Sequence, residues 1–276
     1  MTWFSDKERG FAMSIRQTAI PLGGAIGALL LPWVAKYYGF AFVFGIIAIS
    51  CFLGTAIVWL WLFENKLDIK EKGNTEYKQK SPFLVKEIWR LILASSLLAM
   101  PQIAILTFAM IFLHEYKHIE IIKVSIILVF IQIGGAILRI LAGKFTDKLR
   151  NRRTTIKMIG LFSGVFTIAI GLFANNYPIA IIFCIILSGF LSNAWHGVAY
   201  TEIAVIAGVQ RAGTALGMIG TAIFISGFIT PLIISVIITH FSWNITWCLI
   251  GLCSLLSIPF IPRQKSKKMP HVSYSP

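Results

Sequence analysis

One face of a single apolar stretch gathers the residues most able to do chemistry: Gly189, Asn193, His196 and Tyr200. Their steps of four, three and four put them on one side of a helix, with Trp195 in the adjacent strip. Polar groups in such a helix are costly unless they face a cavity or a partner. The face therefore predicts either a binding surface for a polar solute or a packing seam with internal hydrogen bonds.

Two of the polar side chains suggest more specific roles. His196 is the one histidine placed well inside an apolar stretch, and an ordinary imidazole titrates near a pKa of about 6.5, which suits a proton switch. We hypothesise a proton role for it, with a structural histidine as the alternative. Gln102, which shares a helical face with Ser95, is the best binding candidate of its own stretch; an interhelical hydrogen bond is the alternative.

Arg16 and Gln17 lie just inside the first apolar stretch. A buried arginine there could hold a carboxylate or phosphate in a bidentate pair, which is the only hint of an anionic substrate. The alternative is that Arg16 extends to the membrane surface. Nothing in the sequence pairs a nucleophile with a base or spaces metal ligands, so we expect no enzyme activity, no metal and no cofactor.

Composition decides the class of protein that must position these residues. The chain is 57% hydrophobic and 13% charged, against about 25% charged in a typical soluble domain. The apolar runs are continuous and not alternating, which favours helices over strands. We therefore predict an all-α polytopic membrane protein with eight spans near the ~20 residues that a bilayer requires: 12–36, 40–63, 87–113, 121–142, 155–174, 178–201, 213–238 and 242–262.

The basic residues predict the orientation of these spans. With the N-terminus in the cytoplasm, 20 of the 25 Lys and Arg residues fall on the inner side, and three fall on the outer side. The net charge of +14 then reflects topology and attraction to anionic lipid, and nucleic acid is not needed as a partner. We expect the inner (plasma) membrane of a bacterial cell, with both termini in the cytoplasm.

A basic segment between the fourth and fifth spans, Gly-Lys-Phe-Thr-Asp-Lys-Leu-Arg-Asn-Arg-Arg at 143–153, is read as a cytoplasmic loop that turns at its glycine. It resembles the signature loop of the major facilitator superfamily of secondary transporters. Five residues match that pattern: Gly143, Asp147, Lys148, Arg152 and Arg153. Arg150 stands where the family usually has its second glycine. A merely basic loop is the alternative.

The resemblance implies roles for this segment. In the family, the loop acid of one half lies against a helix start in the other half and holds the cytoplasmic gate through charge and helix dipole. The matching acid is Asp147, and the matching helix start lies near 11–14. Arg152 and Arg153 would add salt links or bind lipid headgroups. Arg139, one helical turn earlier, is expected to brace the loop.

A weak internal repeat between the first and seventh spans is similar to the parallel halves of this family. The eight spans then resemble helices five to twelve of a twelve-helix protein, with the first four absent. The predicted division has four parts: the last two helices of the N-terminal bundle (1–63), a cytoplasmic linker (64–86), a complete six-helix C-terminal bundle (87–262) and a cytoplasmic tail (263–276).

The function implied is secondary active transport of a small solute by alternating access, as a symporter if a proton is coupled, from a truncated chain. The family lines its pathway with the first, fourth, seventh and tenth helices, and only the last two have counterparts here. The alternatives are a non-transporting remnant and a subunit that needs a partner chain to supply the missing helices. The bilayer itself is the remaining expected partner.

Overall fold

The computed structural model describes residues 4–5, 8–61, 81–175 and 178–263. Most of the predicted linker 64–86 and nearly all of the predicted tail 263–276 lie outside the described residues. Within the described part the chain is helical and has no strand. The long helices are α1 (Arg9–Tyr38), α2 (Phe40–Trp61), α4 (Lys86–Ile111), α5 (Ile121–Leu149), α6 (Arg152–Phe173), α7 (Pro178–Ala207), α8 (Ala212–His240) and α9 (Trp243–Ser257).

Short turns extend several of these helices: η1 (Pro82–Leu84), the π-helical η2 (Phe112–Tyr116), η3 (Val209–Arg211) and η4 (Ile258–Phe260). Among the described residues, seven segments are long and apolar enough to cross a membrane, and they contain α2 and α4 to α9. The predicted span 12–36 falls on α1, which is 30 residues long and is not among the seven. The all-α polytopic membrane fold is confirmed.

The segment predicted as a loop at 143–153 is mostly helix, so that prediction was wrong. α5 continues to Leu149, and the chain reverses at Arg150 and Asn151 before α6 begins. Gly143 therefore does not make the turn. The residue that does is Arg150, which has the left-handed conformation (φ 51°, ψ 33°) that glycine adopts most easily. This is the position at which the family pattern usually has glycine.

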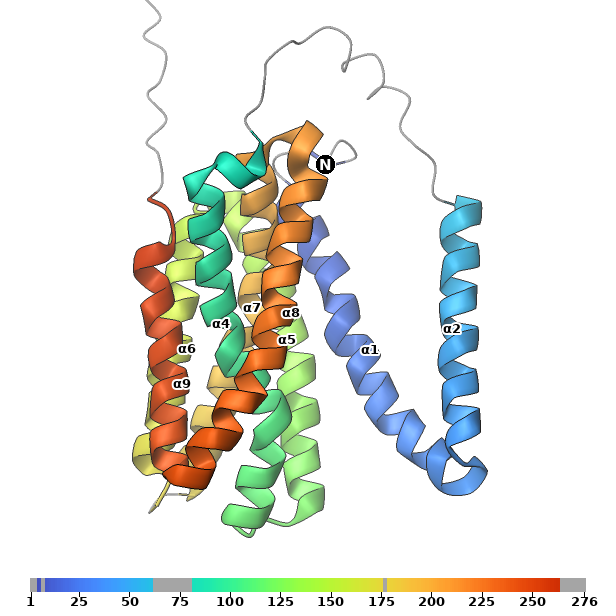
Figure 1. Ribbon diagram of the computed structural model, residues 1–276, viewed down its shortest axis with the longest axis vertical. Helices are drawn as coiled ribbons and strands as arrows, with labels where there is room; N and C mark the ends of the chain where they lie inside the picture. The colour runs from blue at the N-terminus through green and yellow to red at the C-terminus, as the bar shows by residue number, and fades with distance from the viewer. Residues whose placement is uncertain (1–3, 6–7, 62–80, 176–177, 264–276) are drawn as a thin grey trace, which may run out of the picture.

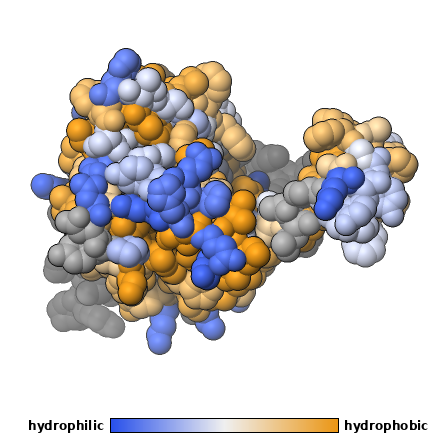
Figure 2. All heavy atoms as spheres, turned by 90° about the horizontal axis from the view of Figure 1, so that it is seen from below, coloured by the Kyte–Doolittle hydropathy of each residue, from blue (hydrophilic) through white to orange (hydrophobic). Residues whose placement is uncertain are grey.

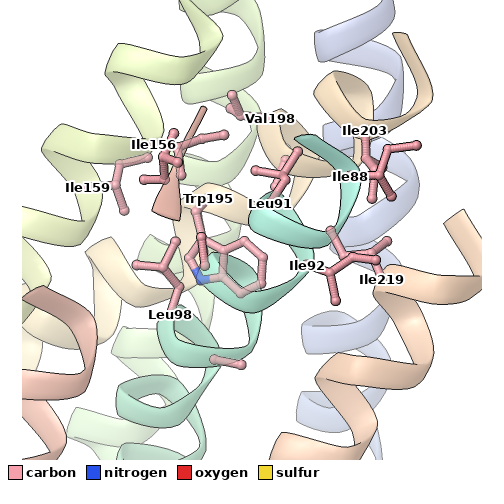
Figure 3. Close-up of a cluster of buried hydrophobic side chains, with 14 of the residues drawn as sticks. Ile88, Leu91, Ile92, Leu98, Ile156, Ile159, Trp195, Val198, Ile203 and Ile219 are labelled. Atoms are coloured by element: carbon pink, nitrogen blue, oxygen red, sulfur yellow. The ribbon is translucent and has the colours of Figure 1, made fainter. Parts of the chain in front are cut away.

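Helices α4 to α9 form one bundle around two apolar clusters (Figure 1). The first cluster surrounds Trp195 with aliphatic side chains of α4 and α6, including Leu98 and Ile156 (Figure 3). The second contains the rings of Phe112, Trp243 and Trp247, which pack against one another. The side chains of both clusters come from the segment that runs from α4 through α9. This six-helix bundle therefore has a core of its own.

Helix α1 lies against this bundle only at one end (Figure 1). We call this the Asp147 end, where α5 meets α6, and we call the opposite end, where α1 meets α2, the far end. From the Asp147 end α1 slants away from the bundle to its junction with α2, and α2 then diverges from α1 and runs apart from α4 to α9. Trp59 of α2 is 83% exposed. Viewed from the far end, the tip formed by α1 and α2 lies to one side of the bundle (Figure 2).

Candidate gate and polar network

Asp147 joins α5 to the start of α1. Its Oδ1 accepts from the Gly10 N–H at 3.0 Å, and its Oδ2 accepts from the Phe11 N–H at 2.8 Å. The first N–H groups of a helix have no partner within the helix, and a carboxylate there also complements the helix dipole. Arg152 lies 3.3 Å from Asp147 Oδ1 and pairs with its charge. The proximity expected from the sequence is therefore found, while the gating role stays a prediction.

Glycines make this close approach of backbones possible. A Cβ on Gly143 would lie 2.5 Å from the carbonyl oxygen of Gly10, and one on Gly10 would lie 2.6 Å from Asp147 Oδ1. Ser14, one turn further along α1, is fully buried against Gly143 and against Gly197 of α7. We call these three glycines the glycine notch. It was missed in the sequence because a notch depends on which helices meet.

Arg139 does not brace the loop as the sequence suggested. Its guanidinium points into the interface of α1, α5 and α7, where the residue is 1% exposed. Nε donates to the Asn193 carbonyl oxygen at 2.8 Å, and Nη2 donates to Asn193 Oδ1 at 3.1 Å. Nη1 donates to the Gln17 carbonyl oxygen at 2.5 Å, and Nη2 lies 3.5 Å from His196 Nδ1. One side chain thus connects three helices.

The Gln17 carbonyl is available because of a proline. In an α-helix this oxygen accepts from the N–H four residues later, and here that residue is Pro21, which has no N–H. Arg139 supplies the donor that the helix lacks. The spacing of Gln17 and Pro21 was the signal in the sequence, although it did not reveal which residue would respond.

The predicted binding residues of α4 and α7 meet in the same network. Gln102 Nε2 donates to Asn193 Oδ1 at 2.8 Å, so this oxygen accepts from both Gln102 and Arg139. A guanidinium has only donors, so a hydrogen bond between Arg139 Nη2 and His196 Nδ1, 3.5 Å apart, requires Nδ1 to accept. The half-buried Tyr200 has its hydroxyl beside the Gln17 side chain.

Trp195 has a different position from the one predicted. It is fully buried in the apolar cluster between α4 and α6, where its indole lies among Leu98, Leu91 and Ile159 (Figure 3). The adjacent strip of α7 therefore faces the core of the six-helix bundle and not the interface with α1. This placement makes Trp195 a packing residue.

The remaining predicted residues lie around this centre. Arg153 pairs with Glu202 of α7 at 2.5 Å and with Glu87 of α4 at 3.4 Å, and it also donates to the Arg263 carbonyl oxygen. Lys148 lines a cavity of about 480 Å³ at the Asp147 end, together with Asp147 itself. The exposed Arg16 lines another, of about 360 Å³, between α1 and α8.

A carboxylate near the α5–α6 corner thus holds the start of α1, as the resemblance of the sequence implied. The family model described as Major Facilitator Superfamily matches residues 1–170 and again residues 125–274. The chain belongs to the Major Facilitator Superfamily. This superfamily (MFS) is a family of membrane transporters that carry small solutes.

Curated relatives are longer than this chain. An uncharacterized MFS-type transporter of Mycobacterium tuberculosis, found in strains CDC 1551 and H37Rv, is 28% identical over 267 residues. The match covers 94% of this chain and 58% of that protein. A membrane sensor protein, UhpC, of Salmonella typhimurium is 22% identical over 299 residues, covering 96% of this chain and 66% of that protein. The chain thus spans less than two-thirds of its M. tuberculosis relatives.

Proposed function

We propose that this MFS chain takes part in secondary active transport of a small solute by alternating access. The observation that carries the proposal is the seal at the Asp147 end, where Asp147 accepts from Gly10 and Phe11, combined with the divergence of α1 from the bundle toward the far end. A transporter that alternates needs one end closed while the other is open. Contacts confined to one end of α1 would close the Asp147 end while the far end is open.

The distribution of basic residues supports a cytoplasmic location for the Asp147 end, in the inner membrane, with both termini in the cytoplasm. The conformation is then closed to the cytoplasm and open to the outside. A labelling experiment tests the orientation. Asn151→Cys should be protected from a membrane-impermeant maleimide in intact cells, whereas Asn175→Cys at the other end should react. The reverse pattern would overturn the orientation.

The polar network supports a solute path between α1, α4 and α7. Gln102 and Tyr200 are half-buried at this interface, and Asn193 connects Gln102 to Arg139. If a proton is coupled, His196 is the proposed carrier, and protonation of Nδ1 would replace its contact with Arg139 by repulsion between two cations. Uptake by His196→Gln that keeps the pH dependence of the unmodified chain would end the proton role.

The test of transport uses the purified chain in proteoliposomes. A mixture of sugars, amino acids, organic acids and inorganic anions is offered outside, and the vesicle contents are measured by mass spectrometry. We expect at least one solute to enter, and we expect its entry to fall in Gly143→Val, which fills the glycine notch. Protein-free vesicles are the control. Entry of no solute would contradict independent transport by this chain.

A second candidate is a chain that does not transport by itself, because it is truncated or because a partner supplies further helices. Two observations favour it: the chain spans 58% of its M. tuberculosis relatives, and one superfamily relative is named a sensor. Mass spectrometry of the native product, isolated through its C-terminus, tests this. Peptides that precede Met1, or a co-purifying membrane chain in fixed ratio, would support it; a lone chain active in uptake would exclude it.

A further inference from the structure

Arg139 carries a positive charge deep in the helix bundle, and all of its partners are neutral. They are two backbone carbonyls, one side-chain amide oxygen and one imidazole nitrogen. Hydrogen bonds to neutral dipoles satisfy the donors of a guanidinium but do not cancel its charge. A buried charge without a counter-charge is costly, and within membrane spans such residues characteristically mark a functional site.

The nearby acidic side chains are used elsewhere. In the described part of the chain, the carboxylates of Asp147, Glu87 and Glu202 pair with Arg152 and Arg153. No ion pair among the described residues includes Arg139, and none includes Arg16. The polar network therefore has an excess of positive charge.

Tyr200 extends the Arg139 network toward α8. Its hydroxyl lies beside the side chain of Gln17, whose backbone carbonyl accepts from Arg139, and a Cβ placed on Gly220 of α8 would lie 3.7 Å from it. Arg16, exposed on α1, lines the cavity between α1 and α8. Gln102, half-buried on α4, reaches the same network through Asn193. Two guanidinium groups, a phenol and an amide on α1, α4, α5 and α7 thus supply hydrogen-bond donors, with no carboxylate among the four.

We propose that Arg139, Arg16 and Tyr200 form the binding site for the anionic group of the transported solute, a carboxylate or a phosphate. The proposal rests on the transport function proposed above and specifies its substrate class. Guanidinium groups bind both anions in bidentate geometry, and they bind them more strongly than they bind neutral oxygens. The anion supplies the counter-charge that this network lacks.

The proposal also connects binding to the seal. Arg139 Nη1 now donates to the Gln17 carbonyl of α1, and an anion held end-on by Nη1 and Nη2 takes the same nitrogen. The anion and α1 therefore compete for Arg139. A bound anion weakens the attachment of α1 near the Asp147 end, so binding favours the movement that opens that end.

The experiment measures binding to the full chain in lipid nanodiscs by isothermal titration calorimetry. The probes are propionate and inorganic phosphate, with propionamide as the neutral match of propionate and choline as the cation. We expect at least one of the two anions to bind, and neither propionamide nor choline. Arg139→Gln should weaken anion binding at least about tenfold, the scale of one lost charge-assisted bond.

Two further variants separate binding from structural damage. Arg16→Gln removes an exposed guanidinium and should fold normally while weakening anion binding about threefold to tenfold. Arg90→Gln is the matched control, because Arg90 also donates to a carbonyl oxygen, that of Pro259 at 2.8 Å, but lies outside the network. Anion affinity should be unchanged in it. If Arg139→Gln does not fold, the difference between Arg16→Gln and Arg90→Gln decides the question.

Three outcomes would overturn the proposal: no binding of either anion to the unmodified chain, equal affinity in Arg16→Gln and Arg90→Gln, or binding of phosphatidylglycerol without binding of either soluble anion. The last would assign the arginines to a lipid headgroup. The proposed transport function fails separately. Uptake of a neutral solute with no anion binding would leave transport standing and refute the anion site, whereas anion binding without any uptake would support the site in a chain that does not transport.

Discussion

The two halves of α1 have opposite surroundings. From Arg9 to Thr18 the helix is held tightly: Ser14 packs into the glycine notch, and the Gln17 carbonyl accepts from Arg139. From Ile20 onward most of its large apolar side chains are exposed, Ile20 by 63% and Ile26 by 62%. The same helix is thus attached at one end and largely free at the other. Attachment of this kind suits a pivot, and it makes the first half of α1 the place where substitutions should have the largest effect.

The largest effect is expected from Gly143→Ala, because the added Cβ would lie 2.5 Å from a backbone oxygen of α1 that has no room to move. We expect α1 docking to weaken by about 2 kcal/mol. The measurement is the maleimide labelling rate of Thr18→Cys, a buried α1 position, with the four native cysteines replaced by alanine. The rate should rise roughly 30-fold.

Gly24→Ala is the matched control for this prediction. A Cβ at Gly24 has nothing within 4 Å, so the same substitution in the second half of α1 should leave the labelling rate unchanged. Equal effects of the two substitutions would show that α1 responds to any added methyl group and would remove the distinction between its halves.

Asp147→Asn should have the next largest effect. The amide keeps one acceptor for the two N–H groups of Gly10 and Phe11 and loses the charge that pairs with Arg152. The free energy of α1 docking on the bundle should fall by about 1–2 kcal/mol, which corresponds to roughly tenfold faster maleimide labelling of Thr18→Cys. Lys148→Gln changes a charge one residue away and should change the rate little. If Lys148→Gln increased the labelling rate as much as Asp147→Asn does, the seal would depend on the net charge of this region and not on the hydrogen bonds of Asp147.

Pro21→Ala tests the link between Gln17 and Arg139 without altering either side chain. The new N–H returns the Gln17 carbonyl to the helix, so Arg139 must share it. We expect docking to weaken by about 0.5–1 kcal/mol, with labelling of Thr18→Cys about threefold faster. Pro101→Ala makes the same change inside α4. It should leave α1 unaffected, and a similar rate in both variants would count against the link.

Arg150→Gly should have no effect on α1 and a small one on the six-helix bundle. Arg150 has φ of 51°, which costs a residue with a Cβ about 1 kcal/mol relative to glycine. We expect a slightly higher melting temperature in thermal unfolding and unchanged labelling of Thr18→Cys. Asn151→Gly, where φ is −121°, should not raise the melting temperature. A rise in both would indicate a general effect of glycine in this turn.

The sequence predicted the attachment of α1 better than it predicted the network behind it. The resemblance of 143–153 to the family's signature loop implied both the carboxylate and the helix start that it holds, and the unpaired N–H groups of a helix start explain why a single acid suits this place. Most span boundaries lie within a few residues of the helix ends, since a continuous apolar run defines a membrane helix, but α5 and α7 continue seven and six residues beyond the predicted ends at 142 and 201. The error at 143–153 arose because glycine was taken to turn the chain, when its role is to let α1 approach.

Arg139 and Trp195 show why the rest could not be predicted. Arg139 bonds to Gln17, 122 residues away in the chain, and nothing local indicates which helices will meet. Trp195 is adjacent to His196 in sequence, yet it faces the bundle core while His196 contacts Arg139. Spacing identifies residues that share a face of a helix. The direction of that face depends on the packing of all the helices together.

The attachment of α1 at one end has a mechanical consequence. At 1.5 Å per residue, the helix extends about 36 Å beyond Ser14 to its end at Tyr38. A rotation of about 10° at the glycine notch would move that end by roughly 6 Å, so α1 is a lever whose fulcrum lies within its first two or three turns. The six-helix bundle provides a firm support for it, because Arg153 fastens α6 to α4 and α7 beside the fulcrum. If α1 pivots there, as the proposed alternating access requires, small changes in hydrogen bonding at Asp147 and Arg139 would produce large displacements at the far end of α1.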